Sequence, residues 1–316
     1  MEEKDYGHKP VLLEECLTAL AIRPEGTYVD GTLGRAGHSR EILRRLSAGG
    51  RLIGIDRDMA AIEAAGERLA EFGDRVTLVH GNFCDLSEIL ASLHVDRVDG
   101  MLFDLGVSSP QLDEARRGFS YMHDAPLDMR MDASAALDAR QVVNTWSGEE
   151  LRRILYEYGE ERYAPQIARA IVRRREEKPI ETTGELVEVI RSAMPAAALR
   201  EKQHPAKRSF QAVRIAVNGE LEALEPMLRS AAEALRPGGR LAVITFHSLE
   251  DRIVKQTLKE LATGCICPPE FPVCVCGRKP RLKLVSRKPI VSGAAELAEN
   301  PRARSAKLRV AERTEF

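Results

Sequence analysis

The sequence predicts a mixed α/β fold, in which helices cover both faces of a parallel sheet and an all-helical insert interrupts the sheet domain. Three observations predict it. Four short β-rich runs alternate with helical spacing between residues 27 and 104, which is typical of parallel strands joined by crossover helices. Residues 138 to 195 contain only helical patterns, and a further strand pattern follows a long helix after residue 210.

The four N-terminal strands are expected at residues 27–30, 51–56, 75–79 and 98–104, each followed by a turn and then a helical run. The first strand ends in the glycine-rich turn GTLGRAGH, which leads into the helical run SREILRRLS. Ligands of open parallel sheets bind beyond the carboxyl ends of the strands. We therefore look for a ligand site at these four strand ends.

The middle of the chain shows four helical runs, ARQVVNTW, EELRRILYEYGEE, PQIARAIVRRREE and ELVEVIRSAM. The α/β pattern then resumes with a helix over 210–235 that breaks near Gly219, a turn at 236–239 and a strand at 240–246. Runs at 282–286 and 306–312 are expected to complete the sheet as an antiparallel pair. These patterns predict one domain at 1–113 and 205–316, and an inserted helical domain at 114–204.

Composition indicates a folded enzyme of the cytoplasm. The chain has 316 residues, of which 44% are hydrophobic, so it can bury a substantial core. No apolar run approaches the roughly 20 residues that span a bilayer, and the N-terminus MEEKDYGHKP lacks the order of a signal peptide. We expect no membrane association. Six cysteines in a chain of this length do not form a disulfide framework, which fits a reducing compartment.

Charge is distributed unevenly behind a formal net charge of -1. Residues 1–113 carry 12 Lys and Arg against 20 Asp and Glu, whereas residues 151–214 carry 14 against 9 and residues 278–316 carry 11 against 4. An anionic polymer lying along the middle and C-terminal regions would explain this segregation. Arg-rich helices with a solvated face would explain it equally well.

The first two strand ends predict a nucleoside site. The glycine-rich turn lacks the GxGxxG order of nicotinamide dinucleotide sites. Asp56 ends the second strand, 19 positions after Gly37, close to the ~20-residue separation expected of an acid that holds ribose hydroxyls. The alternative for Asp56 is an N-cap of the following helix.

The third and fourth strand ends point to the same edge of the sheet. Phe83 follows the third strand, where its ring could cover an adenine face or simply pack in the core. Asp104 stands directly behind an apolar run and precedes Ser108, Ser109 and Pro110. Because a buried charge is costly without partners, we expect Asp104 to lie where the cofactor meets the second substrate.

One motif is not explained by this site. Cys265 and Cys267 form a CxC pair that Cys274 and Cys276 repeat across a Pro-rich loop. Four thiolates can hold a tetrahedral zinc, but the spacing differs from the usual CxxC knuckle. A structural zinc and a redox-labile loop are both open, and we assign no metal ligand to the candidate site.

Eight regions distributed along the whole chain carry a further signal: HKPVLLEE (8–15), YVDGTLGRAGHSR (28–40), LIGIDRD (52–58), DLGVSSPQLD (104–113), RGFSY and PLDMRMD (117–132), HPAKRSFQAVRIAVNGEL (204–221), FHSLEDRIVK (246–255) and NPRARSAKLRVAER (300–313). In these stretches the sequence resembles the ribosomal RNA small subunit methyltransferase H family. The resemblance implies a Rossmann-like class I methyltransferase sheet with an inserted helical substrate-recognition domain.

The activity implied by the resemblance is methylation of the N4 amine of a specific cytidine in 16S ribosomal RNA, within the small ribosomal subunit, by S-adenosylmethionine. The cofactor contacts carry over to Ala36, Gly37, His38, Asp56, Phe83, Asp104 and Gln111. Ala36 departs from the commoner glycine of the first turn, and its methyl group would crowd the cofactor if the backbone needs a positive φ.

The catalytic residues are expected to aim the substrate amine. The N4 lone pair of cytosine is delocalised into the ring, so hydrogen-bond acceptors on its amino hydrogens would direct it along the axis from sulfur to methyl. Asp104, by its carboxylate, and Ser109, by its hydroxyl, are our candidates. A base splayed out of the RNA could stack on Phe119 or Tyr121, although either ring could instead pack a hinge.

Basic side chains outside the cofactor site are expected to contact RNA phosphates. His247 is expected to make a structural hydrogen bond. The competing functions are a nicotinamide dehydrogenase and a ribosome assembly factor that binds RNA and the adenosyl ligand without turnover. The sequence leaves open the target nucleotide, naked RNA or assembled subunit as substrate, and monomer or homodimer. The expected phosphate contacts are His204, Lys207, Arg208, Arg302, Arg304 and Lys307.

Overall fold

The computed structural model describes residues 10–316. These divide into two compact units, one built from the chain up to Gly106 together with Leu221–Phe316, the other from Val107–Glu220. The boundaries expected after residues 113 and 204 both fall inside the second unit. Among the described residues, none of the helices combines the length and apolar character needed to cross a bilayer.

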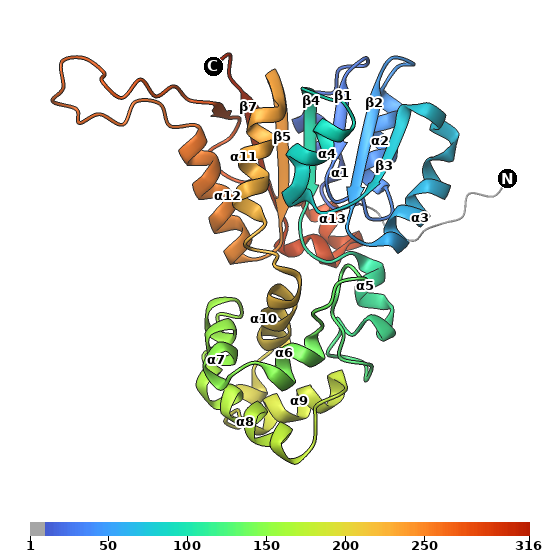
Figure 1. The fold of residues 1–316 in the computed structure, drawn as a ribbon, viewed down its shortest axis with the longest axis vertical. Coiled ribbons are helices and arrows are strands. Elements are labelled where there is room, and N and C mark those ends of the chain that lie inside the picture. Colours follow the sequence, from blue (N-terminus) through green and yellow to red (C-terminus); the bar gives the residue numbers. More distant parts are fainter. Residues whose placement is uncertain (1–9) are drawn as a thin grey trace. The chain divides into compact units, whose positions relative to one another are not determined.

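The first unit contains a seven-stranded sheet in the order β3-β2-β1-β4-β5-β7-β6 (Figure 1). Strands β1 to β5 run parallel, β7 pairs antiparallel with β5, and β6 pairs antiparallel with β7. The expected parallel sheet and its antiparallel pair are therefore confirmed. The strands are β1 (Thr27–Asp30), β2 (Arg51–Asp56), β3 (Val76–His80), β4 (Val98–Asp104), β5 (Leu235–Thr245), β6 (Leu282–Leu284) and β7 (Lys307–Arg313).

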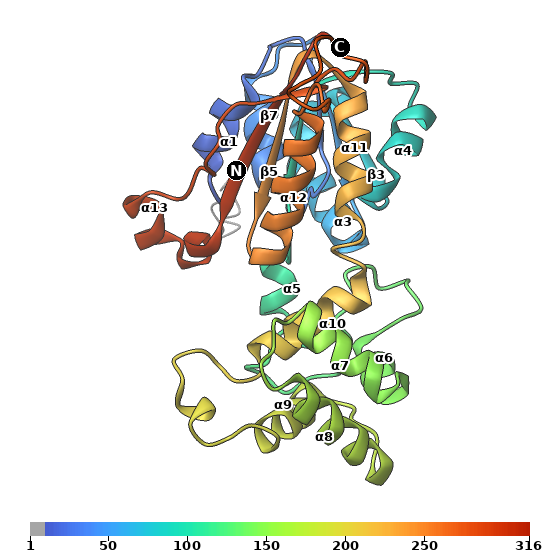
Figure 2. The same cartoon turned by 90° about the vertical axis from the view of Figure 1, so that its left-hand side faces the viewer.

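Helices cover both faces of this sheet, as Figure 2 shows with α11 and α12 on one side and α1 on the other. One hydrophobic core joins α4, α11 and α12 to the strands, and a second joins α1, α2 and α3 to the opposite face. The helices are α1 (Leu13–Leu20), α2 (Gly37–Arg45), α3 (Met59–Leu69), α4 (Leu86–Ser92), α11 (Leu224–Ala234), α12 (Ser248–Leu261) and α13 (Ala294–Glu299), with 3-10 turns η1 (Ala70–Arg75), η2 (Phe83–Asp85) and η5 (Pro301–Ser305).

Strand β5 differs from the expectation, because the segment expected as a turn at 236–239 lies within it. The register jumps from Val98 opposite Leu235 to Gly100 opposite Arg240, so the extra residues bulge out of the ladder. Gly238 has φ 75°, a conformation that glycine adopts without strain. The bulge keeps β5 paired with β4 on both sides of a sequence that reads as a turn.

The second unit is helical and has its own core. Residues Ser147 and Thr182 begin α7 and α9 with capping boxes that satisfy free backbone N–H groups. The four helical runs expected here are confirmed. The helices are α5 (Ser109–Asp113), α6 (Ala139–Thr145), α7 (Gly148–Glu157), α8 (Ala164–Glu177), α9 (Thr183–Ser192) and α10 (Lys207–Asn218), with 3-10 turns η3 (Ala115–Arg117) and η4 (Ala198–Arg200).

Helix α10 belongs to this helical unit, although the sequence pattern joined it to the following sheet domain. Its residues Phe210, Ala212 and Val213 are buried in the helical core. Gly219, with φ 58°, ends the helix, which confirms the break expected at this position. The long helical pattern after residue 210 therefore consists of two helices that serve different units.

Candidate active site

The carboxyl end of β1 carries a buried acid that the sequence analysis did not single out. Asp30 is 2% exposed and accepts hydrogen bonds from Ser39 Oγ at 2.6 Å and from the backbone N–H of Thr32 at 3.2 Å. Burial raises the pKa of Asp30 to about 6. The signal in the sequence was an aspartate directly before the first glycine of the turn.

The glycine-rich turn after β1 packs closely against its surroundings. A Cβ on Gly31 would lie 2.1 Å from the Phe103 ring, and one on Gly37 would lie 2.5 Å from Pro10 Cγ. Ala36 is fully buried with φ 57°, so its methyl group sits in the left-handed region that favours glycine. The positive φ on which the expectation for Ala36 depended is therefore present, and crowding of the cofactor by its methyl group stays a prediction.

Asp56 fastens the turn to the end of β2. Its carboxylate accepts from the backbone N–H of Gly34 at 2.8 Å and of Asp58 at 2.9 Å, while burial raises its pKa. The N-cap of α3 is Asp58, whose side chain accepts from Ala60 N. The alternative role of Asp56 as N-cap is therefore wrong, and its role in holding ribose stays a prediction.

His38 and Asp104 face one another at the ends of α2 and β4. His38 Nε2 lies 3.0 Å from the Val11 carbonyl oxygen, and His38 Nδ1 lies 3.9 Å from Asp104 Oδ2. Burial lowers the pKa of His38 to about 4, so the ring is neutral and Nε2 donates its proton to Val11. This tautomer leaves the Nδ1 lone pair facing Asp104.

Asp104 is held as a neutral acid at neutral pH. Burial, together with the negative charges of Asp30 and Glu250, raises the pKa of Asp104 to about 8. Its Oδ1 is buried and has no hydrogen-bond partner among the described residues. A buried polar atom left unpaired costs about 1–3 kcal/mol. The carboxyl group is therefore suited to a ligand that brings a positive charge or an N–H donor.

Glu250 is the third acid of the cluster that includes Asp30 and Asp104, and it also hydrogen-bonds the backbone at His247. Glu250 is 2% exposed, and its Oε2 accepts from the backbone N–H of Phe246 at 2.8 Å and of His247 at 3.2 Å. His247 in turn caps the N-terminus of α12. These contacts agree with the structural hydrogen bond expected of His247.

Phe83 lies in the core of the first unit. Its ring is 9% exposed and packs edge-on against Phe103 with centroids 6.0 Å apart. The guanidinium of Arg57 lies 5.6 Å from the ring centroid. These contacts agree with the core-packing alternative, and a contact with adenine stays a prediction.

Ser109 and Gln111 lie on α5, in the helical unit. Gln111 is 6% exposed and accepts from the backbone N–H of Ser108 at 3.0 Å, as part of a capping box. Ser109 is half-buried at the first position of the helix. The structure gives Gln111 a role in starting α5, and the expected roles of both residues at the cofactor stay predictions.

Several aromatic and basic residues expected to contact RNA make contacts within the protein itself. Tyr121 stacks on His204 with centroids 4.5 Å apart, and Phe119 is buried in the helical core. Burial, aided by the charge of Arg191, lowers the pKa of His204. Lys307 forms an ion pair with Asp251 at 3.2 Å. Packing explains these residues at least as well as RNA contact.

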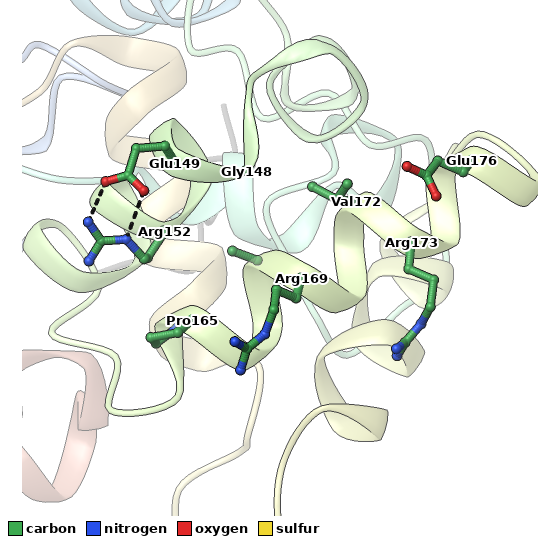
Figure 3. Close-up of a pocket in the computed structure, with 9 residues that line it drawn as sticks. Gly148, Glu149, Arg152, Pro165, Arg169, Val172, Arg173 and Glu176 are labelled. Atoms are coloured by element: carbon green, nitrogen blue, oxygen red, sulfur yellow. Dashed lines mark hydrogen bonds and ion pairs between the residues drawn. The ribbon is translucent and has the colours of Figure 1, made fainter.

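A basic pocket that the sequence analysis missed lies on the helical unit, between α7 and α8 (Figure 3). It has a volume of about 360 Å³. Arg152 is paired with Glu149, but Arg169 and Arg173 are exposed and form no ion pair within the described part of the chain. Exposed guanidinium groups of this kind suit phosphate oxygens.

Comparison with known proteins identifies the family. Residues 5–314 match the model of the MraW methylase family. The chain is 60% identical over 304 residues to the ribosomal RNA small subunit methyltransferase H of Symbiobacterium thermophilum, covering 96% of each chain. It is 58% identical to the protein of the same name from Heliobacterium modesticaldum, covering 98% of this chain and 99% of that one.

Solved structures are more distant. The crystal structure of an rRNA methylase from Streptococcus thermophilus has 11% sequence identity and a TM-score of 0.40, with 96% of this chain and 95% of that chain covered. The assignment depends on the sequence relatives, which span nearly the whole chain at more than half identity. This chain therefore belongs to the MraW methylase family.

Proposed function

We propose that this protein transfers the methyl group of S-adenosylmethionine to the N4 amine of a specific cytidine in 16S ribosomal RNA. Membership of a methylase family and relatives that are named as small subunit rRNA methyltransferases support this function. The observation that carries it in the structure is Asp104, a half-buried carboxyl group at the carboxyl end of β4 whose Oδ1 is buried and unpaired among the described residues.

The residues present fit the cofactor. S-adenosylmethionine carries a sulfonium and an ammonium group, and three adjacent strands, β2, β1 and β4, end in Asp56, Asp30 and Asp104. Acidic groups of low exposure favour a cationic ligand, because its charge offsets their mutual repulsion. Asp56 would accept from the ribose hydroxyls, and the backbone of residues 36–38 would line the methionine portion.

Asp104 is the residue that we propose acts on the reacting atoms. The cofactor supplies an activated methyl group, so the protein has only to position the amine. A positive charge beside Asp104 would lower its pKa, so that its proton would pass to solvent. The carboxylate would then accept a hydrogen bond from the N4 amino group and aim the nitrogen lone pair, and the proton that the amine loses after methylation would leave through water. Ser109 stays our second candidate for this task.

RNA recognition is assigned to the helical unit. The exposed Arg169 and Arg173 beside the pocket on α8 would contact phosphates. The assembled small subunit is the proposed substrate, the cytoplasm the proposed place of reaction, and a homodimer the proposed alternative to a monomer. Light scattering on the purified protein measures the last directly.

The test uses unmodified small ribosomal subunits, free 16S RNA and labelled S-adenosylmethionine, followed by digestion to nucleosides and mass spectrometry. We expect N4-methylcytidine, and its loss in Asp104→Ala. As a matched control, Asp113→Ala removes an acid of the helical unit. Label on another nucleoside would overturn the substrate assignment. Cofactor binding without label on either RNA would favour an assembly factor, and binding of a nicotinamide dinucleotide instead would favour a dehydrogenase.

A further inference from the structure

The loop between α12 and β6 brings four cysteines together. The Sγ atoms of Cys265, Cys267, Cys274 and Cys276 all lie within 4.8 Å of one another. The distance is 3.5 Å between Cys274 and Cys276 and 3.8 Å between Cys276 and Cys265. All four are free thiols. The proposed methyl transfer uses none of them, so the cluster needs a separate explanation.

The sulfur separations match a tetrahedral metal site. Zinc–sulfur bonds of about 2.3 Å place the four sulfurs of a tetrahedron roughly 3.8 Å apart. A disulfide would require about 2.05 Å between two sulfurs. The separations of 3.5 and 3.8 Å are close to this value, and all the separations are within 4.8 Å. The arrangement is therefore close to that of four ligands around one ion, whereas two disulfides would require the sulfurs to move together in pairs.

Backbone amides support the sulfurs, although the CxC spacing differs from a CxxC knuckle. The backbone N–H of Cys267 lies 3.4 Å from Cys265 Sγ, and that of Val275 lies 3.4 Å from Cys267 Sγ. Such donors stabilise thiolates and orient metal ligands. The structure thereby supplies the feature whose absence from the sequence spacing argued against zinc.

The loop contains no hydrophobic core that would hold its shape. In residues 262–281, all of which the structure describes, no side chain is buried. Apolar residues of the loop, such as Ile266, Val273 and Val275, are 60–70% exposed. A segment of this length without secondary structure or buried side chains is uncommon in a compact domain, and small unsupported elements are commonly stabilised by a metal. A bound ion would supply the missing cross-links.

We propose that Cys265, Cys267, Cys274 and Cys276 bind one zinc ion that fixes the shape of this loop. Binding releases the thiol protons, giving a zinc tetrathiolate with four sulfur ligands and no open position for substrate. The ion is structural and takes no part in methyl transfer. The proposal therefore stands independently of the proposed rRNA methylation.

The test begins with the full chain purified under reducing conditions without chelator, and the metal content measured by mass spectrometry. We expect one zinc per chain. Replacing it with cobalt should give the visible bands of a tetrahedral tetrathiolate site, with sulfur-to-cobalt charge transfer. Cys274→Ser should lower zinc affinity at least tenfold and expose the loop to limited proteolysis. Cys84→Ser removes a cysteine outside the cluster and should leave both unchanged.

Three results would overturn the proposal. The first is a failure of the protein to bind zinc when it is reconstituted anaerobically and its thiols stay reduced. The second is iron in place of zinc in protein that has not been reconstituted. The third is a pair of disulfides within the loop under reducing conditions, which would show the redox-labile alternative. Each result is read from metal content and thiol titration, so a failure of the rRNA methyltransferase assay has no bearing on it.

Discussion

Replacing Asp104 by asparagine tests the electrostatic description of the site. The folded protein holds the pKa of Asp104 at about 8, against an ordinary value of 3.8. A raised carboxyl pKa means that the folded state binds more protons than the unfolded state between these values. The stability of the wild-type protein therefore falls as pH rises from about 4 to 8. An asparagine side chain does not titrate, so the variant lacks this contribution.

The magnitude follows from the two pKa values. Between about pH 6.5 and 8.5 the wild type should lose ~1–2 kcal/mol of unfolding free energy relative to Asp104→Asn, at 1.36 kcal/mol per pKa unit. This window lies above the pKa of His38, about 4, and of Asp30, about 6, so neither neighbour obscures the result. Urea unfolding of both proteins at the two pH values measures it.

Cofactor binding provides the second half of this test. If the cation binds the ionised form of Asp104, the competent fraction rises from about one tenth at pH 7 to about three quarters at pH 8.5. The dissociation constant for S-adenosylmethionine should then fall by roughly eightfold, and that of the variant should be weaker and insensitive to this change. Parallel stability curves together with unchanged cofactor affinity in Asp104→Asn would refute the reasoning.

Three further changes test other parts of the structure. Ala36→Gly should raise the unfolding free energy by ~0.5–1 kcal/mol in a thermal melt, because it removes an alanine from the left-handed backbone region. Gly34→Ala, at φ 50°, should lower the unfolding free energy by a similar amount. Changes of the same sign in both variants would contradict this account. Asp99→Ala should lower the free energy of unfolding by ~2–4 kcal/mol in urea without changing cofactor affinity. The reason is that the Asp99 carboxylate, which is 5% exposed, accepts a hydrogen bond from the Thr27 amide and pairs with two arginines. A stability loss below about 1 kcal/mol would show that these ion pairs contribute little. Replacing Arg169 and Arg173 together by glutamate should weaken binding to 16S RNA at least tenfold in a filter-binding assay. The salt dependence of RNA binding should become less steep, and cofactor affinity should stay the same. Unchanged RNA affinity would show that this surface is not part of the substrate interface.

Much of the sheet could be predicted because its strands are short apolar runs, and three of the parallel strands, β1, β2 and β4, end in aspartate. The parallel strands and the antiparallel pair follow from that pattern alone. The bulge in β5 could not, because Pro237 and two glycines have the composition of a turn, and only pairing with β4 keeps them in the strand. The position of α10 also depends on tertiary packing, since Phe210 carries no signal of which core it joins.

The candidate site was predictable in position and less so in detail. Strand order brings Asp56 and Asp104 to one edge of the sheet, which the sequence pattern implies. The pKa of Asp104 depends on burial and on neighbours that are distant in sequence, such as Glu250. No local sequence pattern therefore reveals it. Likewise, the ion pair between Lys307 and Asp251 joins residues 56 positions apart, so the sequence did not show that this expected phosphate contact has a partner inside the protein.

The two units use charge in opposite ways, which explains why the net charge of -1 says so little about function. In the sheet unit, desolvation raises the pKa values of the buried Asp30 and the half-buried Asp104, and the negative charge of a neighbouring acid adds to both shifts. Ionising such a carboxyl group costs free energy, and a ligand of opposite charge offsets that cost. In the helical unit, Arg169 and Arg173 stay exposed, where long-range attraction to a polyanion operates. The two proposed sites would therefore recognise a small cation and a large anion by different physical means, short-range desolvated contact for the cofactor and screened surface attraction for the RNA. We expect a higher ionic strength to weaken RNA binding far more than cofactor binding.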